Sequence, residues 1–559
     1  MRYQFGTGTE QQEYTETIPV SCGMRYGTQA QSYGFLTEKN QFLEKRLQIP
    51  ELNSGYRAVY WLQGQDEPKL AEDEHGCYVD YDGAGEMPLT FVTDVRKEGN
   101  YRVSVELFLP EEAEVLLFLG RRRLAWRGSL AAGSHQILDM PLNICQVIPR
   151  TFTEAMDDTT ADVTVIGRGV RLAAVEVNAW DGRTIYIAGD STVTDQSADY
   201  PYLPEQSYSG WGQMLSAYVG ERAVSNHAHS GLTTESFRSE GHYDILLSRI
   251  GADDICLLQF GHNDQKLMHL MADGGYRENL IRYIKELRER GAVPVLVTPL
   301  ARNSWRGDGS YNDLLADYAK TCIDAAKESD VPLIDLHAHS MAQITKLGRD
   351  RVKAYFFPSD YTHTNDYGAY AAAGFIAGEL HRLGLLEGQV IAQGTEGIWQ
   401  PHDKLRQVPV PKQYQDQENP LAEELLCPLE NPNGALTRAE GFSFVIQTMH
   451  FFPTNVYNDM FADVIGHETY AGTVECAWQN GMIPEGLVED GKIYPAREMT
   501  GEEFLKVLLL GYQSRKPLPV TGADEVQTAE YMKLLPEDFA PENVITREQA
   551  AAICRKLSI

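Results

Sequence analysis

The sequence has little cysteine, and its few Cys residues form no pattern. The 559 residues include eight Cys, scattered from Cys22 to Cys554 without a Cys-x-x-Cys pair or the spacing of metal ligands. Several lie in apolar runs such as 254–258. We therefore expect reduced thiols in the core, with neither a disulfide framework nor a metal site.

Positive charge is also scarce. The chain has 49 Lys and Arg against 79 Asp and Glu, which gives a formal net charge of −30 at pH 7. An acidic protein repels phosphate backbones and anionic membrane surfaces, so we expect no nucleic-acid partner and no membrane partner. Neutral or sparsely charged substrates suit such a protein better.

Long apolar segments are missing as well. No stretch approaches the run of about 20 apolar residues that a membrane span needs. Residues 1–6 have neither the apolar region nor the small-residue cleavage site of a secretory signal. We expect a cytoplasmic protein, or an extracellular one if a leader ahead of Met1 was removed.

The hydrophobic pattern that is present predicts a multidomain chain. Residues 1–180 contain short alternating runs separated by turn residues, which is typical of a β-sandwich. Residues 181–390 alternate strands, such as 184–188 and 255–260, with helices, one of them expected at 211–219. This alternation predicts a parallel sheet covered by helices on both faces, with functional loops at the strand ends.

The remaining segments are a predicted linker and a helical domain. Residues 391–428 are rich in Gln, Pro and charge, as linkers are. Residues 429–559 contain three helical segments that open on Thr437, Thr500 and Thr546, each followed three residues later by Glu or Gln. This spacing predicts a capping box, in which the Thr and the acid or amide satisfy each other's backbone N–H groups.

Four polar blocks stand at the ends of elements in the α/β segment. Ser191 follows the first strand, and Gly231 follows a short second one. Asn263 comes after the buried strand 255–260, and Asp360 and His363 precede the last helix. Each block alone is readily explained as a turn or a helix cap. Local turn chemistry does not, however, predict four such blocks around one parallel sheet.

Together the blocks supply what acyl transfer needs. A serine hydroxyl becomes a good nucleophile when a base takes its proton, so we predict that His363 activates Ser191 and that Asp360 orients the imidazole. The backbone amides of Ser191 and Gly231 and the side chain of Asn263 are predicted to bind the oxyanion. The order Ser, Asp, His along the chain is compatible with this geometry.

These blocks resemble the SGNH (GDSL-like) hydrolases, named after their Ser, Gly, Asn and His. The longer strings at 188–193, 210–213, 260–265 and 362–364 look like those of rhamnogalacturonan acetylesterases. The resemblance covers roughly 183–390, and a galactose-binding type of β-sandwich also precedes this domain in relatives. It implies a flavodoxin-like α/β domain that removes O-acetyl groups from plant cell-wall polysaccharide or oligosaccharides, most of all pectic rhamnogalacturonan, with no metal or cofactor.

The chain also departs from that family. An Arg-Ser pair is expected after Gly231, where this sequence has Leu-Thr-Thr, so the substrate is less certain than the chemistry. Acetylated xylan, acetylated mannan or another small ester is the alternative. The C-terminal segments resemble S-layer homology repeats, which bind cell-wall polysaccharide, so a cell-wall-binding protein is the alternative of another class. The flanking domains also allow for a homo-oligomer.

Overall fold

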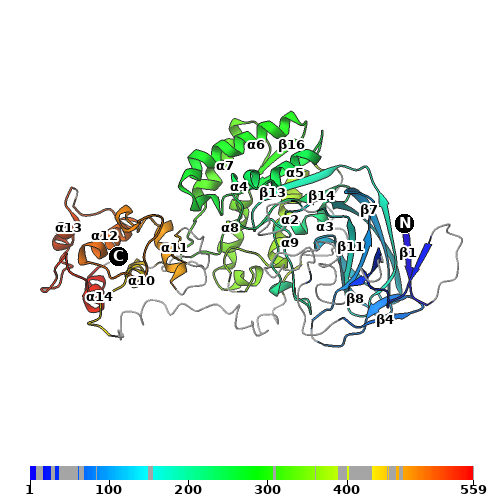
Figure 1. The fold of residues 1–559 in the computed structure, drawn as a ribbon, viewed down its shortest axis with the longest axis horizontal. Coiled ribbons are helices and arrows are strands. Elements are labelled where there is room, and N and C mark those ends of the chain that lie inside the picture. The colour runs from blue at the N-terminus through cyan, green and yellow to red at the C-terminus, as the bar shows by residue number, and fades with distance from the viewer. Residues whose placement is uncertain are drawn as a thin grey trace.

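The computed structural model describes most of the chain. The described residues are 1–7, 17–26, 32–36, 61, 68–83, 85–148, 155, 157–305, 310–358, 360–387, 399–401, 431–449, 451, 453, 461–464, 470–520 and 522–557. The predicted linker lies outside them except for 399–401. Figure 1 shows β-sheets in the N-terminal part, an α/β part in the middle and helices in the C-terminal part.

Two sheets form the N-terminal part. The first has the order β10 (Ser134–Ile144), β7 (Gly99–Leu109), β12 (Arg171–Ala179), β1 (Arg2–Phe5) and β2 (Thr17–Val20), with β5 (Gly76–Val79) beside β12 and β4 (Leu70–Asp73) beside β5. The second has the order β3 (Tyr33–Leu36), β6 (Leu89–Asp94), β11 (Thr160–Ile166), β8 (Ala113–Leu119) and β9 (Arg123–Leu130). Alternate residues of β7 are buried, and one core draws on both sheets. That this part is of the galactose-binding type stays a prediction.

The middle part is a parallel sheet with helices on both faces, as predicted. Its strand order is β14 (Ala223–Asn226), β13 (Thr184–Gly189), β15 (Ile255–Gln259), β16 (Val293–Val297) and β17 (Leu333–Ile334), and every pair is parallel. Ile185 and Ile187 of β13 belong to one hydrophobic core, whereas Tyr186 and Ala188 belong to another. The strand is therefore buried on both faces, which explains its continuous apolar sequence.

The helices around this sheet divide between the two cores. On the Ile185 side are α2 (Trp211–Met214), α3 (Ser216–Val219) and α9 (Asp366–Arg382), and on the other side are α5 (His242–Arg249), α6 (Arg277–Glu289) and α7 (Ala316–Glu328). The remaining elements are α4 (Ser236–Ser239), α8 (Leu336–Leu347), η2 (Pro204–Gln206), η3 (Asp264–Lys266), η4 (Met268–Leu270), η5 (Ala272–Tyr276) and η6 (Arg351–Tyr355). The single helix expected at 211–219 is thus two short ones, because Tyr218 N donates to Leu215 O and tightens the turn between them.

The N-terminal sheets and the α/β part share a hydrophobic core. Leu116 and Phe118 of β8 and Leu124 of β9 belong to the same buried cluster as Trp211 and Ile376 of the α/β part. The predicted boundary at residue 180 stays a prediction, and the core is continuous across it.

The C-terminal helices have a core of their own. They are α10 (Arg438–Thr448), α11 (Ala471–Gln479), α12 (Gly501–Gln513), α13 (Glu525–Tyr531) and α14 (Arg547–Lys556), with η9 (Glu485–Leu487) between them. The predicted capping boxes at Thr437, Thr500 and Thr546 are confirmed.

Three backbone hydrogen bonds close a ring just before these capped helices. Leu436 N donates to Ile545 O (2.9 Å), Ile545 N to Met499 O (3.0 Å) and Met499 N to Leu436 O (2.9 Å). The three repeated segments therefore meet around one approximate axis. Their kinship with S-layer homology repeats stays a prediction.

The cysteines are largely placed as predicted. Six are buried and free, namely Cys77, Cys145, Cys256, Cys322, Cys476 and Cys554. Cys22 is free and half-buried, and Cys427 lies outside the described residues. Among the helices that the structure describes, none is long and apolar enough to cross a membrane.

Candidate active site

Ser191 lies in a tight loop directly after β13, which we call the Ser191 loop (residues 190–196). Asp190 Oδ1 accepts hydrogen bonds from Thr192 N (3.0 Å) and Thr192 Oγ1 (2.7 Å), which folds the loop on itself. A Cβ at Gly189 would lie 2.7 Å from Gln259 O, so only glycine fits at the end of the strand. The loop therefore presents Ser191 at the carboxyl edge of the sheet.

Ser191, His363 and Asp360 form one hydrogen-bonded chain. His363 Nε2 lies 2.7 Å from Ser191 Oγ, and His363 Nδ1 lies 2.7 Å from Asp360 Oδ2. A neutral imidazole that donates from Nδ1 to the carboxylate keeps Nε2 free to accept the serine proton. The structure thus brings the three predicted catalytic residues into direct contact.

The Asp360 carboxyl is held in its ionised form. Its burial raises the pKa, but the neighbouring His363 and hydrogen bonds from His363 N (2.9 Å) and Thr362 N (2.7 Å) outweigh burial and bring the pKa below its ordinary value. A carboxylate in this position stabilises an imidazolium as it forms.

Two aromatic side chains that the sequence reasoning missed flank this chain. The rings of Tyr208 and Phe357 stack with centroids 3.4 Å apart, and Tyr208 meets the His363 ring edge-on at 5.7 Å. The Tyr208 hydroxyl donates to Asp360 Oδ2 (3.3 Å). Both residues lie in loops without any strand or helix pattern, so no sequence signal marked them.

Gly231 lies in the loop after β14, beside the Ser191 loop. Its backbone φ is +86°, and a Cβ there would meet no atom within 4 Å, so the residue borders open space. Gln196 Nε2 donates to both Ser191 O (3.3 Å) and Ser230 Oγ (3.3 Å), which ties the two loops together. Within the part of the chain that the structure describes, no protein acceptor takes the backbone N–H of Ser191 or Gly231.

Asn263 is joined to the same edge of the sheet. Its Nδ2 donates to Leu232 O (2.9 Å), next to Gly231, and its Oδ1 accepts a hydrogen bond from Lys266 Nζ. With Oδ1 held by the lysine, the second Nδ2 hydrogen is available to a ligand. Gly231 and Asn263 therefore join Ser191 through neighbouring groups and not by a direct hydrogen bond.

A buried pair beneath the Ser191 loop was also missed. His262 Nδ1 lies 3.3 Å from Asp190 Oδ2, and His262 Nε2 lies 2.9 Å from Leu300 O. Burial raises the Asp190 pKa, but His262 and the bonds from Thr192 outweigh it, and the net pKa is lowered. His262 lies in the 260–265 string, where it had no predicted role. Among the described residues, no group of three His, Cys, Asp or Glu could hold a metal ion.

A serine bonded to an imidazole that is bonded to a carboxylate, at the strand ends of a parallel α/β sheet, defines a serine hydrolase. Residues 187–371 match the model of the GDSL-like lipase/acylhydrolase family. The chain belongs to the GDSL-like lipase/acylhydrolase family.

Similar proteins match parts of this chain. The probable rhamnogalacturonan acetylesterase YesY of Bacillus subtilis is 36% identical over 210 residues, which are 36% of this chain and 94% of that protein. The rhamnogalacturonan acetylesterase RhgT of Bacillus subtilis is 34% identical over 215 residues, 36% of this chain and 90% of that protein. The solved structure of Bacillus subtilis YxiM covers 68% of this chain and 98% of its own, with 24% identity and a TM-score of 0.35.

Proposed function

We propose that this protein is a serine esterase that removes O-acetyl groups from pectic polysaccharide or its oligosaccharides, of the rhamnogalacturonan type. The observation that carries the proposal is the unbroken chain of hydrogen bonds from Ser191 through His363 to Asp360. The names of YesY and RhgT support the acetyl ester and the pectic substrate.

The proposed reaction follows from these contacts. His363 Nε2 takes the proton of Ser191 as its oxygen attacks the acetyl carbonyl, and Asp360 stabilises the resulting imidazolium. His363 then protonates the departing sugar oxygen. Water deprotonated by His363 attacks the acetyl-serine, and acetate leaves while Ser191 regains its proton.

The oxyanion of each tetrahedral intermediate needs donors that are already in place. The backbone amides of Ser191 and Gly231 lack protein acceptors among the described residues, and Asn263 Nδ2 has a hydrogen to give. Removing one such donor lowers kcat by about 100- to 1000-fold. We therefore assign the oxyanion site to these three groups.

Replacing the nucleophile tests the mechanism. Ser191→Ala should abolish hydrolysis of nitrophenyl acetate while circular dichroism and melting temperature stay those of the parent protein. Ser248→Ala is the matched control, because the Ser248 hydroxyl in α5 donates to Ile245 O and, among the residues that the structure describes, to no other acceptor. An alanine variant at 191 that keeps most of its activity would disprove the mechanism.

A substrate panel tests the second half of the proposal. The kcat/KM for acetate release should be highest on acetylated rhamnogalacturonan fragments. It should be lower on acetylated xylan and mannan fragments and on short lipid esters. Faster release from acetylated xylan or mannan would support the esterase activity and contradict the pectic substrate.

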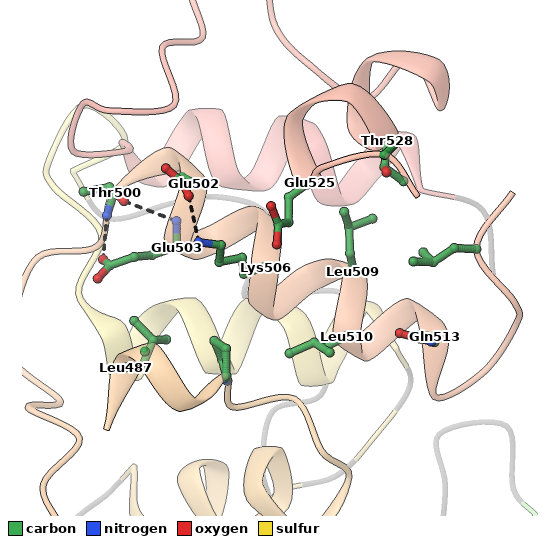
Figure 2. A pocket seen from close by; sticks show the side chains of 14 residues that line it. Leu487, Thr500, Glu502, Glu503, Lys506, Leu509, Leu510, Gln513, Glu525 and Thr528 are labelled. Carbon is green, nitrogen blue, oxygen red and sulfur yellow. Dashed lines mark hydrogen bonds and ion pairs between the residues drawn. The ribbon is translucent and has the colours of Figure 1, made fainter. Parts of the chain in front are cut away.

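A hollow among the C-terminal helices favours a second function, binding of cell-wall polysaccharide. A pocket of about 560 Å³ lies between α12 and α13, lined by Leu509, Thr528 and the ion pair of Lys506 with Glu502 (Figure 2). Such a function requires export. If these helices bind cell walls, the full chain should sediment with isolated cell walls. A chain that ends at residue 401 should stay in the supernatant. Equal sedimentation of both would exclude these helices as the binding site.

A further inference from the structure

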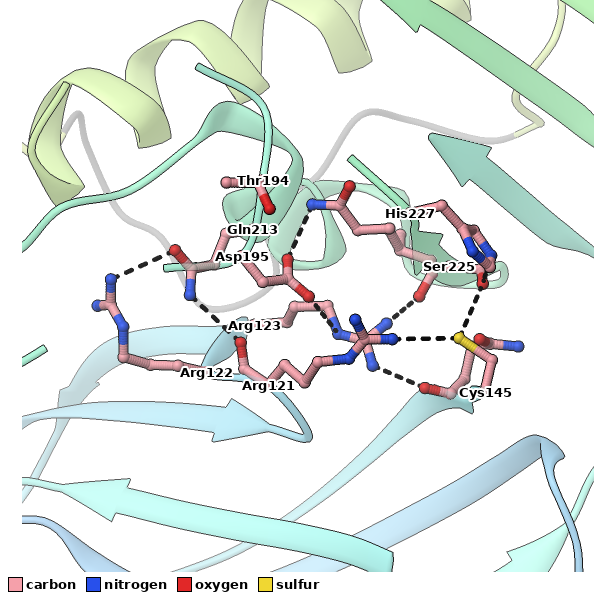
Figure 3. Close-up of polar contacts among 12 residues, drawn as sticks. Arg121, Arg122, Arg123, Cys145, Thr194, Asp195, Gln213, Ser225 and His227 are labelled. Carbon is pink, nitrogen blue, oxygen red and sulfur yellow. Dashed lines mark hydrogen bonds and ion pairs between the residues drawn. The ribbon is translucent and has the colours of Figure 1, made fainter. Parts of the chain in front are cut away.

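The turn between β8 and β9 inserts Arg122 into the α/β part. The side chains of Arg122 and its ion-pair partner Asp366 are both 0% exposed. The Arg122 backbone has a φ of 52°, a left-handed conformation that is unfavourable for a residue with a side chain. Such a conformation is maintained only where the surrounding contacts enforce it. Figure 3 shows Arg122 with its neighbours Arg121 and Arg123 against the α/β part.

The Arg122 guanidinium binds three separate segments of the α/β part. Its Nε donates to Gln196 O (3.0 Å), at the end of the Ser191 loop. Its Nη1 and Nη2 donate to the two carboxylate oxygens of Asp366 (2.7 and 3.2 Å), at the start of α9. Its Nη2 also donates to Tyr208 O and, at 3.3 Å, to Gln213 Oε1 in α2. A planar guanidinium is suited to this role because its donors have a fixed geometry.

Each of these segments adjoins a catalytic group, either by a side-chain contact or along the chain. The Gln196 side chain donates to Ser191 O (3.3 Å). The Tyr208 side chain contacts both the His363 ring and Asp360. Asp366 follows His363 by three residues.

The neighbouring Arg123 braces the same loop from a second point. Arg123 Nε lies 3.7 Å from Asp195 Oδ2, and Arg123 Nη2 donates to Asn143 O (2.6 Å) in β10. Asp195 in turn accepts a hydrogen bond from Asn226 Nδ2 (2.8 Å), which also donates to Val193 O (2.9 Å). The Ser191 loop is therefore fixed to the N-terminal sheets at both Gln196 and Asp195.

We infer that Arg122 is a positioning residue of the active site, supplied by the N-terminal sheets, which aligns the Ser191 loop with the segment that carries His363 and Asp360. The inference rests on the proposed role of Ser191. Ser191 comes from β13, whereas His363 precedes α9, so their 2.7 Å contact depends on what holds these two elements together. A displacement of about 1 Å between reacting groups can lower a rate about 100-fold.

Arg122→Lys and Arg122→Met test the inference against Arg127→Met. Arg127 is a matched control because it also lies in this hairpin, pairs with Glu114 (2.8 Å) and covers the rings of Trp399 and of Tyr370 in α9, yet among the described residues it contacts neither the Ser191 loop nor residues 208–213. A phosphonylating reagent counts the competent Ser191 in each protein, and kcat and KM for nitrophenyl acetate are expressed per counted site. Thermal melting reports the fold.

We expect kcat per counted site to fall about 100-fold in Arg122→Met and about 10-fold in Arg122→Lys, with KM nearly unchanged. The lysine variant should lose less, because lysine keeps a positive charge opposite Asp366 although it lacks the several fixed donors of the guanidinium. Arg127→Met should melt at a lower temperature with kcat unchanged. Arg122 variants that melt early but keep the kcat of the parent would overturn the inference. Failure of both Arg122 variants to fold would also overturn it, because the residue would then serve the fold alone. If the parent protein itself neither reacts with the reagent nor hydrolyses the ester, the proposed function fails instead.

Discussion

The N-terminal sheets and the C-terminal helices flank the same α/β part in different ways. The sheets share a hydrophobic core with it through Leu116 and Phe118 and insert the fully buried Arg122. The helices close around a separate core. A charged residue of these helices interacts with the α/β part. Burial lowers the pKa of Arg302 in the α/β part, and the negative charge of Glu475 in α11 opposes that shift. The first unit is therefore part of the enzyme's framework, and the second is attached to it.

Deleting each unit is the strongest way to break this comparison. A chain without residues 1–181 should fail to fold, because it uncovers the faces of α2 and α3 that pack on β9 and the apolar cluster that α9 shares with β8. A chain that ends at residue 401 should fold and keep its kcat. Esterase assays and gel filtration of both chains decide the matter, and an active chain without the sheets would reverse the comparison.

A buried arginine in the C-terminal unit provides a matched test. Arg438 donates to Leu487 O (3.0 Å), Ile493 O (3.0 Å) and Glu503 Oε1 (2.8 Å). Arg438→Met should lower the free energy of unfolding of this unit by about 3 to 5 kcal/mol and leave kcat unchanged. Urea unfolding should show the loss in one of two transitions. The exposed Arg497→Met, which breaks a surface pair with Glu489, should change neither transition measurably.

The dependence of stability on pH separates the units further. Burial raises the pKa of Asp264 from its ordinary 3.8 to about 7. The folded state therefore holds a proton between about pH 4 and 7 that the unfolded state has lost, and stability falls as pH rises through that window by up to about 1.4 kcal/mol per pH unit. Above pH 7 this group adds no further change.

Asp264→Asn should flatten that dependence in the transition of the α/β part and leave the C-terminal transition as it was. Urea titrations at pH 4 to 8 of parent and variant measure the difference. An unchanged slope between pH 4 and 7 would show that Asp264 titrates near its ordinary pKa.

The smallest expected effect concerns a helix cap. Thr500 Oγ1 accepts from Glu503 N (3.2 Å), and Glu503 Oε2 accepts from Thr500 N (3.0 Å). Thr500→Ala should cost about 1 kcal/mol in the C-terminal transition alone, and Thr500→Ser should restore most of it. A shift of the other transition would mean that the two units unfold together.

Local patterns made the sheet and the Ser, His and Asp cluster predictable. A strand such as β13 is buried on both faces and therefore has a continuous apolar sequence. Ser191, Asn263 and the block from Asp360 to His363 lie directly beside strands or helices that the sequence pattern predicts. Capping boxes are equally local, because the two partners are three residues apart.

The rest depends on contacts between distant residues. Arg122 and Asp366 are 244 residues apart, and no spacing marks either as a partner of the other. The stacking of Tyr208 on Phe357 joins two loops. The position of each loop depends on the strands and helices that flank it. The break between α2 and α3 is likewise set by packing, since the sequence of 211–219 is a good helix pattern.

The ring of backbone bonds through Leu436, Met499 and Ile545 bears on how the protein is made. A chain emerges from the ribosome N-terminus first, so the sheets and the active site have all their partners before Ile545 is synthesised. The C-terminal helices can close only when translation is nearly complete. A transcript truncated before Ile545 would therefore yield an active esterase whose C-terminal helices lack their closing contacts.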